Sequence, residues 1–328
     1  MTAGHPRETQ QLRGHAEQEA AFLSALVSGR VHHAWLLTGP EGVGKATFAY
    51  QAARRLLGAA PIGEGLATRL DDTTARLMAG GAHPDFMVLD RHGEDGKPRK
   101  VIPVDEARRL PEFFSKAPAA SPWRVAIIDA ADDLNVNAAN AILKTLEEPP
   151  PRGVLFLVSH APGKLLPTIR SRCRLLTFRA PDPAVAEEIV RGRSGLDGHA
   201  IARLLKMGGG APGLALRMAD SGALALDDAA HELLTGLSRP EHAPLLALAD
   251  SFRGGEGGER FQLLMARLAD RVRQMAADQA LEGRTEDLDR WAEAWETLGR
   301  IARDADALNL DRADSFWTAV RALRAAAA

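Results

Sequence analysis

A phosphate-binding loop with one part missing begins at Gly39 and reads Gly-Pro-Glu-Gly-Val-Gly-Lys-Ala. In the full G-x-x-x-x-G-K-[ST] pattern, glycines let backbone N–H groups surround phosphate oxygens, the lysine contacts the β- and γ-phosphates, and the final hydroxyl binds Mg²⁺. Gly44 and Lys45 are in place, and Gly42 lies within the loop, but Ala46 replaces the hydroxyl residue. We therefore predict a degenerate nucleotide-binding loop.

Two further positions bear on metal binding and hydrolysis. Thr47 comes one residue after Ala46, so its side chain points about 100° further around the predicted helix and is a poor substitute. Asp129 ends the apolar run 125–128 and has the place of a Walker B acid, which supports Mg²⁺. A glutamate that polarises water usually follows, and Ala130 stands there. Asp129 is either a residual site residue or only a cap for the next turn.

Arg170 and Arg172 come just before the last predicted strand. A guanidinium presented to a neighbouring subunit's triphosphate, called an arginine finger, stabilises charge on the transferring phosphoryl group. Most arginines in surface loops are simply solvated, and these two residues alone do not decide the matter. Upstream, the apolar spacing within 134–146 predicts an amphipathic helix, which Pro149 and Pro150 end.

The elements that must position these residues alternate between strand and helix patterns from about residue 15 to 180. Such alternation predicts βαβ units and a mostly parallel sheet, which binds ligands at the carboxyl ends of its strands, where the loop at Gly39 lies. Only helical patterns follow residue 179, and residues 92–100 predict an exposed loop. The expected strands are 34–38, 86–90, 124–129, 154–159 and 175–179.

Composition restricts the class of protein. A chain of 328 residues with 45% apolar residues should hold two or three domains. A net charge of −2 argues against a strong non-specific nucleic-acid binder. The single cysteine, Cys173, excludes an internal disulfide and a cysteine-based zinc site. No apolar run approaches a membrane span and no signal core is seen, so we expect a cytoplasmic protein without a membrane partner.

Several longer strings stand out in the first half of the chain. They are His-Ala-Trp-Leu-Leu-Thr-Gly-Pro at 33–40, His-Pro-Asp at 83–85, Val-Asp-Glu-Ala-Arg at 104–108, Asn-Ala-Ile-Leu-Lys-Thr-Leu-Glu-Glu-Pro-Pro at 140–150 and Ser-Arg-Cys at 171–173. Taken together, these strings resemble the clamp-loader branch of the AAA+ proteins, and within it the δ′ family of bacterial DNA polymerase III. Weaker similarities lie at 210–216, which resembles a sensor-2 region, and at 307–311.

The resemblance implies three domains. They are an α/β RecA-like P-loop (AAA+) domain over 1–179, a small helical lid domain over 180–238 and an all-α C-terminal collar domain for oligomerisation over 239–328. ATP-hydrolysing γ/τ relatives would carry Ser or Thr at 46, an acid at 130 and an arginine at 213. This sequence has Ala46, Ala130 and Gly213 instead. The combination resembles a non-hydrolysing δ′ subunit.

The site implied by the resemblance has two parts. Arg172 would be a catalytic arginine finger that acts in trans on the neighbouring γ/τ ATPase. The chain's own degenerate nucleotide site would bind ATP or ADP weakly, if at all, and no cofactor is required. It would consist of Gly39, Gly42, Gly44, Lys45, Thr47 and Asp129.

The implied partners are the γ/τ and δ subunits, the sliding clamp through indirect or weak contact, and primed DNA through the assembled loader. No zinc is expected, because the segment 57–81, where many relatives carry four cysteines, has none. Two alternatives stay open. One is an active P-loop ATPase, in which Thr47 supplies the hydroxyl and Asp132 or Asp133 replaces the glutamate. The other is a DNA-binding adaptor outside replication.

Overall fold

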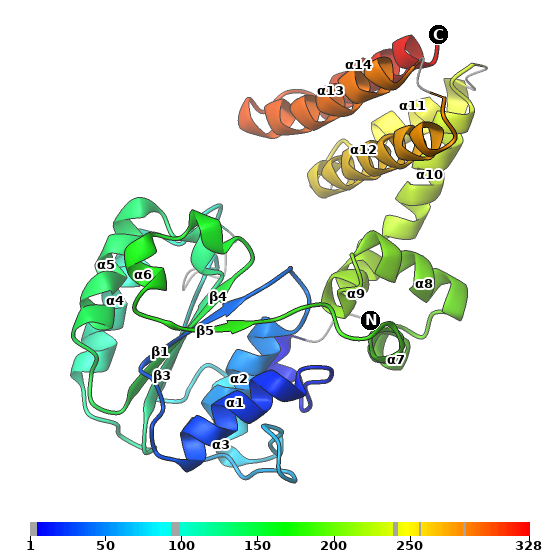
Figure 1. Cartoon of the computed structure of the whole chain (residues 1–328). Coiled ribbons are helices and arrows are strands. Elements are labelled where there is room, and N and C mark those ends of the chain that lie inside the picture. Colours follow the sequence, from blue (N-terminus) through cyan, green and yellow to red (C-terminus); the bar gives the residue numbers. More distant parts are fainter. Residues whose placement is uncertain (1–4, 93–98, 239–241, 256, 285–286) are drawn as a thin grey trace. The chain divides into compact units, whose positions relative to one another are not determined.

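Five parallel strands form one sheet in the order β2-β3-β4-β1-β5 (Figure 1). The computed structural model describes residues 5–92, 99–238, 242–255, 257–284 and 287–328, so most of the predicted loop at 92–100 lies outside the described residues. The predicted parallel sheet is confirmed. The strands are β1 (Ala34–Thr38), β2 (Phe86–Asp90), β3 (Arg124–Asp129), β4 (Gly153–Ser159) and β5 (Arg174–Thr177).

Strand boundaries agree with the sequence for β1, β2 and β3, and β4 begins one residue before the expected 154–159. The last strand differs most, because we expected it at 175–179 whereas β5 begins at Arg174 and ends at Thr177. Its neighbour β1 ends at Thr38, whose carbonyl accepts the N–H of Phe178 at 2.7 Å. Beyond that bond β1 offers no further partner, so the ladder stops and the Phe178 ring turns into the core.

Helices cover both faces of the sheet because successive strand residues point to opposite sides. On one face, Trp35 and Leu37 pack with α1 (Ala16–Val27), α2 (Lys45–Leu56) and α3 (Thr73–Ala79) (Figure 1). On the other face, Leu36 packs with α4 (Val104–Ser115) and α5 (Val136–Glu147). The side chain of Asn135 caps α5, and Pro149 and Pro150 follow its end, as predicted.

Contacts within the chain divide it into two compact units, Met1–Arg217 and Met218–Ala328. The predicted boundaries at 179/180 and 238/239 stay a prediction. In the second unit, a core that includes Phe252, Phe261 and Phe316 joins five helices. The remaining helices are α6 (Pro167–Arg170), α7 (Pro183–Ser194), α8 (Gly198–Met207), α9 (Pro212–Asp220), α10 (Ala223–Thr235), α11 (His242–Asp250), α12 (Gly257–Leu281), α13 (Leu288–Ala307) and α14 (Arg312–Ala327).

Among the described residues, no helix combines the length and the apolar character that a membrane span needs.

The string His-Pro-Asp at 83–85 has a clear local role in the first unit. The fully buried carboxylate of Asp85 accepts N–H groups from Ala119 at 2.8 Å, Ala120 at 2.7 Å and Ser121 at 3.0 Å. Burial alone would raise the pKa of Asp85, but these donors and Arg124 outweigh it and lower the pKa. One side chain thus fastens the loop that leads into β3.

We predict that Asp85→Asn lowers the free energy of unfolding by about 2 kcal/mol at pH 7, because an amide cannot satisfy all three buried donors. The folded pKa is depressed, so this stabilisation is present above the unfolded pKa of about 4 and disappears as pH falls through the folded value. Urea denaturation at several pH values measures the difference. The exposed Asp105→Asn is the matched control, and an equal loss in both variants would contradict the assignment.

Candidate functional site

The loop between β1 and α2 has the backbone geometry of a phosphate-binding loop. Gly39 has φ 140° and Gly44, which caps α2, has φ 115°. A Cβ on Gly39 would lie 2.1 Å from the carbonyl oxygen of Phe178, so only glycine fits between the loop and the end of β5. The sequence therefore dictates the fold of this loop, at the carboxyl edge of the sheet where it was predicted.

The lysine of this loop is bound to the loop's own backbone. Lys45 is 2% exposed, and its Nζ donates to the carbonyl oxygens of Gly39, at 2.6 Å, and Pro40. Burial lowers the pKa of Lys45 to about 8, against the opposing charges of Asp129 and Glu41. Two of the three N–H donors of this ammonium are thus taken by the loop's own carbonyls.

Helix α9 lies directly against the loop. The N–H of Gly213 donates to the carbonyl oxygen of Gly42 at 2.8 Å, and a Cβ on Gly213 would come within 2.8 Å of that same oxygen. One turn further along α9, Arg217 pairs with Glu41 at 2.7 Å. Gly213 occupies the position where hydrolysing relatives are expected to carry arginine. Its lack of a side chain is what permits this contact.

The carboxyl groups near the end of β3 either have a raised pKa or already have a hydrogen-bond or ion-pair partner. Asp129 ends the strand, and burial, with the neighbouring Asp90, raises its pKa to about 6. Asp132 accepts hydrogen bonds from Ser159 Oγ at 2.7 Å and from the N–H of His160. Asp133 pairs with Arg91 Nε at 3.1 Å. Asp132 and Asp133, the two candidates for the missing glutamate, thus hold neighbouring segments.

Two cavities flank the loop within the first unit. One, of 570 Å³, is lined by Lys45, Ala46, Thr47, Asp129 and Ala130 among others. The other, of 580 Å³, lies against the loop and the helices that follow β5, and Thr47 lines it as well. The predicted nucleotide-site residues are therefore brought together.

The residues present do not fit a Mg²⁺–nucleotide complex. The ion prefers an octahedral set of oxygens, of which the protein normally supplies a loop hydroxyl and an ionised carboxylate. Ala46 supplies no hydroxyl, so one of these two protein ligands is missing, although Asp129, whose pKa burial raises to about 6, is still largely ionised at neutral pH. Across the described ranges, no group of three or more His, Cys, Asp or Glu side chains could hold a metal ion.

Arg172 lies at the opposite edge of the sheet from the loop. It precedes β5, whose first residue, Arg174, pairs with Trp35 near the start of β1, whereas the loop follows the end of β1 (Figure 1). Its Nη1 donates to the carbonyl of Thr168 at 3.0 Å, and its Nη2 pairs with Glu147 Oε1 at 3.0 Å. The structure therefore separates Arg172 from the other predicted site residues.

Sequence reasoning missed the roles of two side chains, Glu147 and Arg217, and one contact of a third, Asp132. Glu147 belongs to the string at 140–150 but had no assigned role, and it proves to hold Arg172. Arg217 carried a usable signal, because it follows Gly213 by four residues and so shares a helix face with it. The attachment of Asp132 to Ser159 carried none, since the two residues are joined only by the pairing of β3 with β4.

A family model described as "DNA polymerase III, delta subunit" matches residues 14–182. The δ′ subunit of Pseudomonas aeruginosa is 38% identical over 58% of this chain and 56% of its own length. The δ′ subunit of Yersinia pestis is 31% identical over 75% of this chain and 72% of its own length. The match to the Escherichia coli δ′ subunit covers 57% of that protein, so this chain spans little more than half the length of several relatives.

Among solved structures, a gamma subunit-related protein of DNA polymerase III from Thermotoga maritima matches with a TM-score of 0.58 and 19% identity. The match covers 93% of this chain and 98% of that one. At this identity the likeness shows the fold alone. It agrees with the predicted α/β P-loop fold of the AAA+ class, followed by helices. From its sequence matches, the chain belongs to the δ′ subunit family of DNA polymerase III.

Proposed function

We propose that this chain is a non-hydrolysing clamp-loader subunit that scaffolds the loader ring and lends Arg172 to the ATPase site of a neighbouring γ/τ subunit. The observation that carries the proposal is the separation of Arg172 from the chain's own loop. Five residues of β1 separate the two edges of the sheet, which is about 15 Å at the rise of a strand. Arg172 cannot serve its own loop across that distance.

The present partners of Arg172 are weak enough to be exchanged. The Arg172 side chain is 35% exposed and that of Glu147 is 51% exposed. Such a surface ion pair contributes about 0.2–1 kcal/mol. A charge-assisted hydrogen bond to a desolvated phosphate contributes about 1.5–3 kcal/mol. The guanidinium of Arg172 would therefore leave Glu147 and bind a triphosphate presented at this edge. Until then, Glu147 keeps the Arg172 side chain oriented.

The composition of the chain's own loop is a second argument for the same proposal. Hydrolysis needs a metal, an activated water and a free lysine. Here Ala46 and Ala130 lack the required groups, and Lys45 is bound to backbone carbonyls. The alternative of an active ATPase would need Asp132 or Asp133 as the base, and both hold neighbouring segments. We therefore prefer the scaffold to the ATPase.

The partners proposed for this chain are the γ/τ and δ subunits of a loader in the cytoplasm. Contact with the sliding clamp would be indirect or weak, and primed DNA would be reached through the assembled loader, in line with the net charge of −2. We also propose that no zinc or other cofactor is required. Any binding of ATP or ADP would be weak and independent of Mg²⁺, since the loop's glycines and Lys45 remain.

We predict that Arg172→Ala leaves assembly intact and lowers the DNA-stimulated ATPase activity of a loader reconstituted with its γ/τ and δ subunits. The neighbouring site should lose on the order of 10³-fold in rate, as arginine fingers do. Steady-state phosphate release measures the loss. Arg170→Ala, an exposed arginine two residues away, is the control and should retain full activity. Equal rates for both variants and the wild type would remove Arg172 from the mechanism.

We further predict that the isolated chain does not turn over ATP and that its affinity for ADP is the same with Mg²⁺ or with EDTA. The physical reason is the absence of a hydroxyl at position 46, one of the two groups with which the protein normally holds the ion at such a loop. Calorimetric titration and a phosphate-release assay check the two statements. Brisk turnover that vanishes in Lys45→Ala would instead establish the active ATPase.

A further inference from the structure

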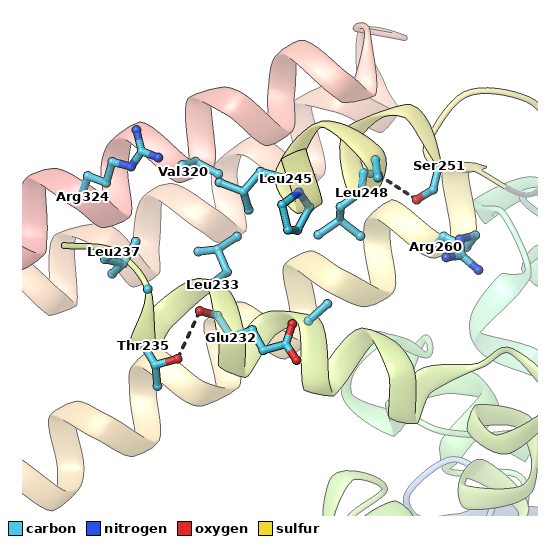
Figure 2. A pocket seen from close by; sticks show the side chains of 14 residues that line it. Glu232, Leu233, Thr235, Leu237, Leu245, Leu248, Ser251, Arg260, Val320 and Arg324 are labelled. Carbon is cyan, nitrogen blue, oxygen red and sulfur yellow. Dashed lines mark hydrogen bonds between the residues drawn. The ribbon is translucent and has the colours of Figure 1, made fainter. Parts of the chain in front are cut away.

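The second unit contains a cavity of 710 Å³ that the clamp-loader proposal does not use (Figure 2). It is formed by the end of α10, by α11, by the start of α12 and by the end of α14. Leu233, Leu245, Leu248 and Val320 give it an apolar wall. In Figure 2 these side chains lie between Arg324 on one side and Arg260 on the other.

Two arginines, Arg260 and Arg324, line the cavity at separate places. Nε and Nη2 of Arg324 and Nε of Arg260 have no accessible surface and no hydrogen-bond partner among the residues that the structure describes, so a ligand in the cavity would meet the other nitrogens of these guanidiniums. Each guanidinium is always charged and its nitrogens only donate, so each attracts a carboxylate. The cavity therefore carries a positive charge at each of two separate places.

The other polar groups around the cavity do not alter the positive charge that the two arginines give it. The hydroxyls of Thr235 and Ser251 donate to carbonyls of their own helices and have no proton left to offer. Glu232 also lines the cavity, but its side chain is exposed to water, which screens its charge. The buried part of the wall is thus apolar with two cationic ends.

We propose that this cavity binds a short peptide segment of a partner protein, with an apolar centre and an acidic side chain on each side of it. Apolar side chains of the peptide would pack on the leucines of α10 and α11, and its carboxylates would accept hydrogen bonds from Arg260 and Arg324. A fatty acid carries one carboxylate at one end, so it can satisfy only one of the two arginines. The proposal does not depend on the clamp-loader assignment.

The test is selection of random 12-residue peptides, displayed on phage, against the immobilised full-length chain. Enriched peptides are synthesised with a fluorophore, and their dissociation constants are measured by anisotropy. We expect sequences with two acidic residues flanking apolar ones. Their affinity should fall about tenfold in Arg324→Gln and in Arg260→Gln, because each substitution removes a charge-assisted hydrogen bond.

Matched controls lie on the same helices. Arg321→Gln on α14 changes an arginine that bonds to Thr318 outside the cavity, and Leu246→Lys on α11 changes a leucine that is 53% exposed and outside the lining. Neither should alter the affinity, whereas Leu245→Lys, which changes a lining leucine, should abolish it. Circular dichroism verifies the fold of each variant.

Several outcomes would overturn the proposal. They are a selection without enrichment, enriched peptides that lack acidic residues, and equal affinities for Arg324→Gln, Arg260→Gln and the wild type. Binding of dodecanoate that depends on Arg324, when no peptide binds, would also overturn it and would assign the cavity to a small amphiphile.

Discussion

The constraint on which this molecule depends is the common direction of its five strands. In a parallel sheet, everything that follows a strand gathers at one edge and everything that precedes a strand gathers at the other. The phosphate-binding loop follows β1 and Arg172 precedes β5, although these strands are neighbours. One sheet can therefore present a nucleotide-type loop on one edge and a cationic side chain on the other, and a ring of such subunits would bring unlike edges together.

Polar groups of the phosphate-binding loop find their hydrogen-bond partners within the chain itself. Lys45 bonds to two carbonyls of the loop, and the carbonyl of Gly42 bonds to Gly213. Lys45 Nζ, a donor that a phosphate would otherwise accept from, is thus paired internally, and the Gly42 carbonyl has its own donor, which stabilises the loop without a ligand. The conformation of the loop therefore does not depend on a bound phosphate. A rigid loop also anchors β1 and α2, so the sheet keeps its shape.

The sequence predicted much of the fold and only part of the site. Short apolar runs between helical patterns placed every strand to within two residues, because the central strands of a parallel sheet are buried on both faces and so are continuously apolar. Local rules also gave the loop and the end of the helix before Pro149. They could not give the contact of Gly42 with Gly213, the pairing of Arg172 with Glu147 or the attachment of Asp132, since each joins segments far apart in the chain.

The close packing of Gly213 on Gly42 restricts which residues position 213 can hold. A Cβ there would come within 2.8 Å of the carbonyl oxygen of Gly42, so an arginine introduced at 213 alone would collide with the loop backbone. Such a substitution would therefore need a second change that moves the loop or the start of α9. Substitutions at 213 and in the loop are thus expected to be energetically coupled and not independent.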